Sequence, residues 1–499
     1  MPSTFISEKQ LSANTAGLIQ RIVERQGEEF YVIENYDNIE PFFISLVSHS
    51  DHWMFIGSNG GLSAGRQDEN NALFPYYTDD KIIASAGQTG PVTFVKLIFD
   101  EKAVVWFPFS DRYKGIYRIK RTLYKSKWGN SLIFEEENRD LEMIFRYSWR
   151  FSEKYGFVRS CELINTGKKD KQVELLDGLK NLLPYGVDSD MQKTKSNLVN
   201  AYKRNELDES GLGIYALSAM IIDRAEPSEA LRATICWSTG VKSKEVLLSE
   251  DQIEKFMWGE KLKSERDKKG VPGAYLINFN EKIEPSGSKK WKIIADLEYS
   301  QPKIRDLIQK INSHPDQLND EIDTDLSNGT ESLKSLVAKA DGLQYSANKM
   351  VTGRHYSNVL FNIMRGGLFE DDYSIEKEDL LDYLDYHNHS ILDKHKAFFE
   401  KLPGQMIYGD LLGEANKTKD KDLIRLCFEY LPLSFSRRHG DPSRPWNKFS
   451  INLVNEVGKK ERFYQGNWRD IFQNWEALAY SFPGFTIGMI TKFLNASTA

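Results

Sequence analysis

The chain has 499 residues, and its 40% hydrophobic and 28% charged content is typical of a globular protein with two to four domains. A net charge of −6 provides no basic excess to neutralise phosphates, so we expect no nucleic-acid partner. The three cysteines are widely spaced, no run of about 18 apolar residues occurs, and the N-terminus lacks the basic start and apolar core of a secretion signal. We therefore expect a cytoplasmic protein with no disulfide framework and no membrane partner.

Between about residues 27 and 300, short apolar or alternating runs recur, separated by turn residues such as those at 58–61 and 165–167. Many strands without regular intervening helices predict a large antiparallel sandwich, and we assign it to residues 1–300. The expected strands are Phe30–Ile33, Phe42–Val47, Trp53–Ile56, Val92–Phe99, Ala103–Phe107, Leu141–Trp149, Phe157–Ile164, Gln172–Leu176, Leu231–Trp237 and Trp291–Leu297.

After Pro302 the pattern changes to helical spacing. Residues 304–311 and 331–340 predict two helices, and the acidic stretch Asp320–Asn328 between them predicts a connecting segment. We assign 301–344 to a helical linker and 345–499 to a helical domain. The helices expected in that domain are Ser357–Met364, Lys377–Leu384, Ser390–Leu402, Asp422–Tyr430 and Arg469–Tyr480.

Several known binding motifs require residue spacings that this sequence does not have. The glycine-rich run Gly57–Gly65 fits neither a dinucleotide fingerprint nor a P-loop. A calcium loop starting at Asp323 would need glycine at its sixth position and glutamate at its twelfth, and both are missing. His387 and His389 fall on different faces of a helix and have no third ligand. We expect no metal and no cofactor.

Three segments combine polar and aromatic residues densely enough to suggest a site. Asn70–Lys81 is an expected loop, which either binds a ligand or caps neighbouring strands. Ser434–Trp446 contains prolines and a glycine that forbid a regular helix, together with Arg438, His439 and Asp441, and this favours a site over packing. The third segment is Arg462–Glu476.

The segment Arg462–Glu476 has helical period from Trp468 onward. Its expected apolar stripe is Trp468, Ile471, Phe472, Trp475, Leu478 and Ala479. A polar stripe beside it contains Arg469, Gln473, Glu476 and Tyr480, flanked by Asp470 and Asn474. Such a helix suits the wall of a sugar pocket, although an ion-pair network between helices would explain its charges equally well.

The run from Arg444-Pro-Trp-Asn447 through Phe463-Tyr-Gln-Gly to Trp468-Arg-Asp-Ile-Phe-Gln-Asn-Trp-Glu-Ala-Leu478 resembles the entry to the catalytic barrel of inverting glycoside phosphorylases. These are typified by cellobiose and chitobiose phosphorylases and by the phosphorylase-like domain of cyclic β-1,2-glucan synthases. The resemblance implies an N-terminal antiparallel β-supersandwich, a helical linker and an (α/α)6 barrel. It also implies that Arg469, Asp470 and Gln473 line a sugar subsite, whereas Asn474 replaces an aspartate of the family.

Length limits what the resemblance implies. Twelve barrel helices with their loops need roughly 250 residues, whereas 345–499 provides 155. The length therefore predicts an incomplete barrel. The resemblance implies that the general acid lies well downstream of the Arg-Asp pair, so we expect it beyond Ala499 and expect no catalytic residue within the chain. A homodimer or a C-terminal half is the expected partner that completes the barrel.

From these observations we expect the N-terminal portion of a glycoside phosphorylase-like or inverting glycoside-processing enzyme acting on glucosides or oligosaccharides. The expected partner is an oligosaccharide or disaccharide substrate, and inorganic phosphate is the expected co-substrate of phosphorolysis. The residues expected to bind the sugar are Arg469, Asp470, Gln473, Glu476, Tyr464, Arg438, His439 and Asp441. The alternative is a non-catalytic carbohydrate-binding or assembly module built on the supersandwich.

Overall fold

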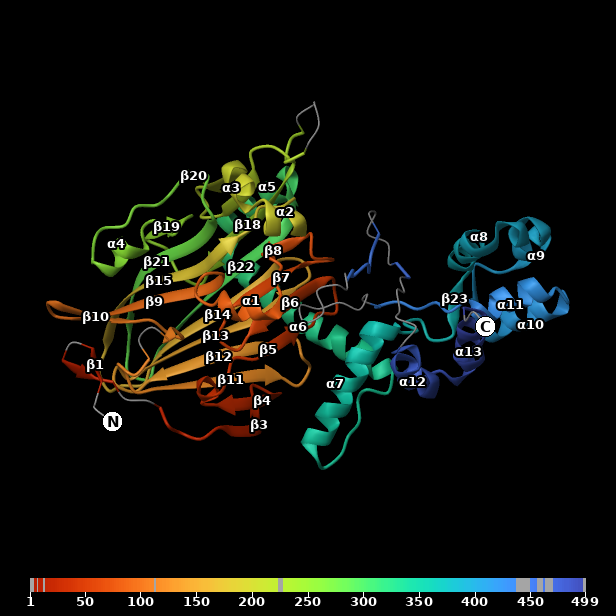
Figure 1. The fold of residues 1–499 in the computed structure, drawn as a ribbon, viewed down its shortest axis with the longest axis horizontal. Helices are drawn as coiled ribbons and strands as arrows, with labels where there is room; N and C mark the ends of the chain where they lie inside the picture. The colour runs from red at the N-terminus through yellow and green to blue at the C-terminus, as the bar shows by residue number, and fades with distance from the viewer. Residues whose placement is uncertain are drawn as a thin grey trace. The chain divides into compact units, whose positions relative to one another are not determined.

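The protein is described from a computed structural model that covers residues 4–6, 8–11, 14–111, 114–222, 228–436, 449–455, 461–462 and 470–496. These residues form two compact units, and the chain passes from the first to the second between Glu331 and Ser332. We call them the β unit and the helical unit and describe each by itself (Figure 1).

The largest sheet of the β unit has eleven described strands, and neighbouring strands pair antiparallel. In spatial order they are β20 (Asp267–Lys269), β16 (Lys203–Leu207), β17 (Gly213–Leu217), β18 (Arg232–Thr239), β22 (Ser288–Ser300), β14 (Gly156–Asn165), β13 (Met143–Ser152), β12 (Leu132–Asn138), β11 (Ile119–Ser126), β4 (Glu28–Glu34) and β3 (Ile19–Arg25).

Two further antiparallel sheets complete the sandwich, and a short pair lies near the N-terminus. The five-stranded sheet contains β10 (Lys102–Trp106), β9 (Gly90–Phe99), β15 (Lys171–Leu182), β21 (Gly273–Ile283) and β19 (Glu245–Leu247) in that order. The four-stranded sheet contains β5 (Phe43–Leu46), β6 (His52–Gly57), β7 (Leu62–Arg66) and β8 (Ala72–Phe74), and the short pair is β1 (Phe5–Ile6) with β2 (Lys9–Gln10).

The main core lies between these sheets, and strand alternation determines which side chains enter it. In β14, Phe157 and Leu163 belong to the core shared with the five-stranded and four-stranded sheets, whereas Val158 belongs to a cluster on the opposite face. In β22, Ile293 and Ile294 divide in the same way. The period of two predicts this arrangement, because successive side chains of a strand point to opposite faces.

Helices cover the opposite face of the large sheet. They are α5 (Gln301–Ser313) and α6 (Pro315–Lys339), and the side chains of Leu318, Ile322 and Leu326 on α6 pack against the sheet cluster. The stretch Asp320–Asn328 is therefore helical and does not connect two helices, which corrects that prediction. The prediction followed the acidic residues and overlooked the apolar row of Leu318, Ile322 and Leu326. These residues are spaced four apart, which places them on one face of a helix.

Short helices occupy connections of the β unit. They are η1 (Tyr36–Asn38), α1 (Asp79–Ala84), α2 (Ser189–Thr194), α3 (Ser196–Tyr202) and α4 (Ile253–Met257). Helix α4 packs Phe256 against Leu176 and Leu276 on the outer face of the five-stranded sheet.

The helical unit contains α7 (Lys349–Gly366), α8 (Lys377–Lys394), α9 (Lys396–Lys401), α10 (Tyr408–Lys417), α11 (Lys421–Glu429), α12 (Ile471–Ser481), η4 (Pro483–Phe485) and α13 (Thr486–Ala496). It also holds a two-stranded antiparallel pair, β23 (Ser374–Glu376) with β24 (Gln405–Ile407), that the sequence did not predict. The helix expected over 390–402 is divided between the end of α8 and α9.

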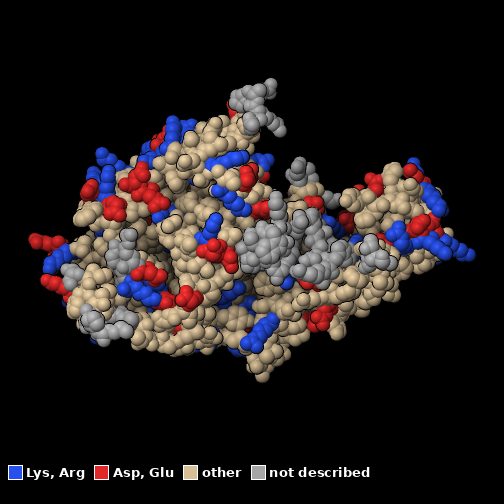
Figure 2. All heavy atoms as spheres, in the orientation of Figure 1, with Lys and Arg blue, Asp and Glu red and all other residues tan. Residues whose placement is uncertain are grey.

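The described chain is thus a mixed α and β protein with large antiparallel sheets, and the ten strands predicted in the β unit are confirmed. The described helices do not by themselves confirm an (α/α)6 barrel. None of the described helices is both long enough and apolar enough to cross a bilayer. On the face shown in Figure 2, acidic and basic side chains are interspersed.

Candidate functional site

Helix α12 carries two of the residues that the sequence places in a sugar site, Gln473 and Glu476, and Asp470 precedes its first turn. Ile471, Trp475 and Leu478 are buried, as their spacing predicts. Phe472 departs from the predicted stripe: it is 58% exposed, and its ring centroid lies 4.5 Å from that of Phe493. The indole Nε1 of Trp475 donates a hydrogen bond of 2.8 Å to the carbonyl oxygen of Gly366, so α12 is anchored to the end of α7.

The polar side of α12 is open. Gln473, Glu476 and Tyr480 are exposed, and their spacing of three and four residues places them along one side of the helix. Asp470 is half-buried at the position that precedes the first turn. These residues keep the arrangement predicted for them. The other predicted sugar ligands, Arg438, His439, Asp441, Tyr464 and Arg469, lie outside the described residues.

Asn474, expected on the flank of the polar stripe, is buried instead. It is 1% exposed, and its Oδ1 has no hydrogen-bond partner among the described residues. A Cβ at Gly366 would lie 2.8 Å from the backbone oxygen of Asn474, so α7 and α12 approach closely at this point. Asn474 is thus part of the helix contact.

Arg462, at the start of the predicted segment, belongs to an ion-pair network. Its guanidinium lies 3.1 Å from a carboxylate oxygen of Asp371 and 3.4 Å from one of Asp379. Burial raises the pKa of Asp379, and the hydroxyl of Tyr430 donates a hydrogen bond to that carboxylate. For Arg462, therefore, the contacts agree with the alternative interpretation of the segment, an ion-pair network.

The segment Asn70–Lys81, expected to be a loop, contains strand β8 and the start of helix α1, and its polar groups bond to neighbouring residues. The amide oxygen of Asn70 accepts from the backbone N–H of Ser189 at 3.1 Å, and the N–H of Tyr76 donates to the side chain of Gln192 at 2.8 Å. These bonds match the capping alternative rather than a ligand-binding loop.

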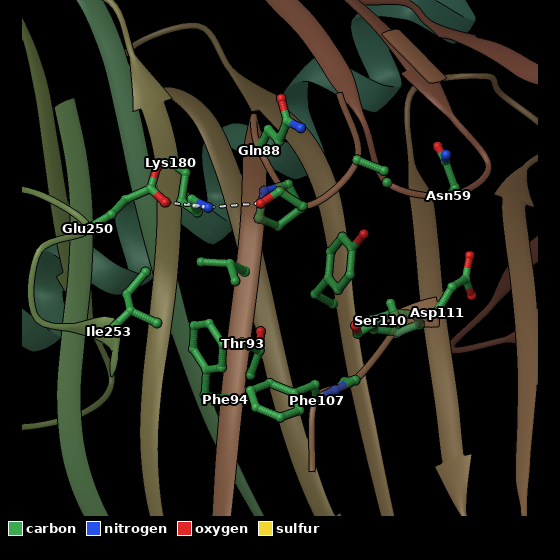
Figure 3. Close-up of a pocket in the computed structure, with 18 of the residues that line it drawn as sticks. Asn59, Gln88, Thr93, Phe94, Phe107, Ser110, Asp111, Lys180, Glu250 and Ile253 are labelled. Atoms are coloured by element: carbon green, nitrogen blue, oxygen red, sulfur yellow. Dashed lines mark hydrogen bonds and ion pairs between the residues drawn. The ribbon is translucent and has the colours of Figure 1, made fainter. Parts of the chain in front are cut away.

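The β unit contains a cleft that the sequence did not predict. We call it the β9 cleft; its volume is about 920 Å³, within the range of ~300–1,000 Å³ typical of small-molecule sites. Figure 3 shows Asn59, Ser110 and Asp111 on one side, Lys180, Glu250 and Ile253 on the other, and Thr93 and Phe94 between them. Tyr147, Arg159, Phe107 and Trp258 also line it.

A buried ion pair supports this cleft. The guanidinium of Arg159 donates to both carboxylate oxygens of Asp177 at 2.9 Å, and both side chains are fully buried. Asp177 also accepts from the hydroxyl of Thr93 at 2.6 Å and the indole of Trp291 at 2.7 Å. Four donated bonds hold the carboxylate in place, and this network orients Thr93 and Arg159.

These cleft residues carry no sequence signal that would have grouped them. They come from the β6–β7 turn, from β9, β13, β14 and β15, and from the segment at α4, so no local spacing links them. The one local hint is the pair of aromatic residues that follows β10, Phe107 and Phe109.

Residues 369–432 match the family described as Glycoside hydrolase family 149 insertion domain 1. The structure shows what the ends of this segment do. Leu368 and Ser434, just outside it, exchange backbone hydrogen bonds of 2.9 and 3.0 Å. The chain therefore leaves and re-enters at one point, as expected for a domain inserted into another.

Solved structures with distant similarity include a polysaccharide lyase, a bacterial glucoamylase in complex with acarbose, and a protein provisionally described as a kojibiose phosphorylase from the human microbiome. Their identities are 9%, 10% and 9%, their TM-scores 0.32, 0.33 and 0.31, and they cover 52%, 71% and 92% of this chain. The chain spans 34%, 42% and 50% of their lengths. No curated protein matches the sequence.

Proposed function

We propose that the chain is part of a carbohydrate-active enzyme of the glycoside hydrolase or phosphorylase type that acts on glucosides or oligosaccharides. The observation that carries the proposal is the match of residues 369–432 to a glycoside hydrolase insertion domain, in a segment whose ends meet at Leu368 and Ser434. Helices α7 and α12, which flank the insertion and pack together, would then belong to the host domain, an (α/α)6-type barrel.

In this proposal the exposed side of α12 binds sugar hydroxyls. Gln473 offers an amide that donates and accepts, and Glu476 offers a carboxylate, so the pair suits vicinal hydroxyl groups. Asp470 would act beside them, together with Arg469, Tyr464, Arg438, His439 and Asp441.

The reaction would be an inverting displacement. A carboxylic acid protonates the glycosidic oxygen, the bond from that oxygen to the anomeric carbon breaks, and phosphate or water bonds to the same carbon from the opposite face. Phosphate as attacking group yields a sugar phosphate, whereas water yields the free sugar.

The test is turnover of β-glucosyl disaccharides and oligosaccharides by the intact protein, with and without inorganic phosphate. We expect Gln473→Ala and Glu476→Ala each to lower kcat/KM about tenfold or more, because each removes a charged or amide hydrogen bond to the sugar. Glu400→Ala, at an exposed position on α9, is the matched control and should leave turnover unchanged. Absence of turnover on every substrate under both conditions would refute the enzyme proposal.

A further inference from the structure

We infer that the β9 cleft is a second saccharide site, which holds a neutral oligosaccharide in the β unit independently of α12. The inference goes beyond the proposed catalytic function, because all residues that line the cleft belong to the β unit. It requires only that the protein meets a glycan chain.

The cleft lies along a free stretch of strand edge. Strand β9 pairs with β15 over Gly90–Ile98, but its other neighbour, β10, pairs only with Val95–Phe99. Within the described residues, the backbone groups of 90–94 that point away from β15 therefore have no strand partner. These backbone N–H and C=O groups need hydrogen-bond partners, and the hydroxyl groups of a sugar can provide them.

The hydroxyl of Tyr147 is a hydrogen-bonding group that the cleft wall offers to a ligand. Tyr147 is 3% exposed, yet its hydroxyl makes no hydrogen bond to any described residue. Its ring is held in place by stacking on Phe134 at 4.9 Å and by the Arg159 guanidinium at 4.8 Å from the ring centroid. The Tyr147 hydroxyl is not among the enclosed unpaired side-chain atoms of the described residues, so it is open to the cleft and free to exchange a hydrogen bond with a ligand hydroxyl.

Aromatic surfaces line the cleft at two depths. Phe94 and Phe107 form an edge-to-face pair with centroids 5.0 Å apart, and both rings are visible side by side in Figure 3. Trp258 lies at the rim and is 79% exposed, unusual for so large an apolar side chain. The C–H groups on one face of a pyranose ring pack well on the negative face of an aromatic ring.

The charges of the cleft argue for an uncharged ligand. Its two cationic residues are already neutralised: Arg159 pairs with Asp177, and Lys180 lies 2.5 Å from a carboxylate oxygen of Glu250. Asp111 pairs with Arg121 at 2.5 Å. No cation among these residues is left to hold a phosphate or a carboxylate, so a neutral glycan fits better than a nucleotide or an acidic sugar.

The cleft wall after β10 is held in a strained conformation. Phe109 has a φ of 65°, rare for a bulky residue, and its N–H donates to a carboxylate oxygen of Glu136 at 2.7 Å. Glu136 is itself paired with the buried Arg121 at 2.8 Å. Strain that buried partners maintain is characteristic of binding sites, since it keeps a wall open before the ligand arrives.

An extended peptide added to the edge of β9 is the competing occupant. Pro91 opposes it, because proline has no N–H to donate to a new strand and occurs on sheet edges that resist pairing. The aromatic rim and the unpaired hydroxyl also suit a sugar better than a backbone ladder.

The test is titration of the intact protein with cellohexaose, laminarihexaose and maltohexaose, followed by calorimetry and tryptophan fluorescence. We expect saturable binding of at least one of them. Trp258→Ala should raise its Kd about fivefold to tenfold through loss of a stacking surface. Tyr147→Phe should raise Kd about threefold to tenfold without lowering Tm, because the deleted hydroxyl makes no hydrogen bond to the residues that the structure describes.

Two controls separate this site from the proposed catalytic one. Trp128→Ala removes a tryptophan of the β unit that does not line the cleft and should leave Kd unchanged. The double variant Gln473→Ala, Glu476→Ala should lose turnover yet retain binding in the cleft. The inference is overturned if no hexaose binds, if both cleft variants bind as the unaltered protein does, or if an alternating Thr-Val decapeptide saturates the cleft instead. Each of these results would leave the turnover test intact.

Discussion

Buried charges among the described residues of the β unit are mostly paired, and Lys203 is one exception. It lies at the start of β16 and is 5% exposed, and its ammonium group has no partner among the described residues. Burial lowers the pKa of Lys203 from 10.5 to about 8. Arg159 is buried more completely, but its charge faces Asp177, so burial there is compensated.

We predict that Lys203→Met stabilises the β unit at pH 7. The unfolded chain binds the Lys203 proton up to pH 10.5 and the folded chain only up to about pH 8, so the charged lysine costs at most about 3 kcal/mol below pH 8. Between pH 8 and 10.5 stability rises with pH as this cost is relieved. The advantage of the variant should therefore shrink over that window, measured by urea unfolding at several pH values. Lys261→Met, at an exposed position, is the control, and a gain independent of pH would contradict the explanation.

At the scale of elements, periodicity identified ten strands and several helices but not their ends, and it missed others, including the eleven-residue strand β21. Helix α12 begins at Ile471, and its buried residues have the predicted spacing. Strands β23 and β24 have three residues each and were not predicted, because a run so short shows no period. Helix α7 begins with a side-chain cap: Asn348 Oδ1 accepts from the N–H groups of Met350 and Val351 at 3.1 and 3.2 Å.

We predict that Asn348→Ala lowers the stability of the helical unit by about 1 kcal/mol, because the two N–H groups lose their acceptor. Asn348→Asp keeps an acceptor oxygen at the same position and adds a charge that favours a helix N-terminus, so it should be close to neutral. Denaturant unfolding followed by helical circular dichroism measures both. Equal losses in the two variants would show that the cap does not stabilise α7.

At the scale of the whole molecule, the boundary between the two units lies inside α6, and this determines which fragments of the chain can fold independently. The first part of α6 packs Leu318, Ile322 and Leu326 on the large sheet. Hydrogen bonds join the same region to the sandwich, including one of 2.9 Å from Arg150 to the hydroxyl of Thr330. The β unit is therefore completed by helices that follow its last strand.

We predict that a fragment of residues 1–340 folds by itself, because it keeps the helices that cover the large sheet. It should show β-rich circular dichroism, remain monomeric on size exclusion and bind the hexaose of the intact protein with a Kd within about threefold. A fragment ending at residue 302 should aggregate, since it exposes Val158, Ile235 and Trp237 on a bare sheet face. Equal behaviour of the two fragments would show that α5 and α6 are dispensable.

The sequence predicted the candidate site on α12 only as far as local spacing reaches. Gln473 and Glu476 share a side of the helix because they are three residues apart, and periodicity shows this directly. The burial of Asn474 was not predictable, because it depends on Gly366, more than a hundred residues earlier, which lets α7 approach α12. The β9 cleft was missed for the same reason: its residues share no spacing.

The sequence by itself determined the order of a β-rich part before a helical part, ten strands of the sandwich and most of the buried and exposed positions of α12, since hydrophobic period is a local property. Tertiary structure alone decided that Asp320–Asn328 is helical, that the ends of residues 369–432 meet, and that a cleft with an unpaired Tyr147 hydroxyl opens beside β9. Each of these depends on contacts between segments that are far apart in the sequence. Such contacts produce no residue spacing within either segment, so the sequence of one segment does not reveal them.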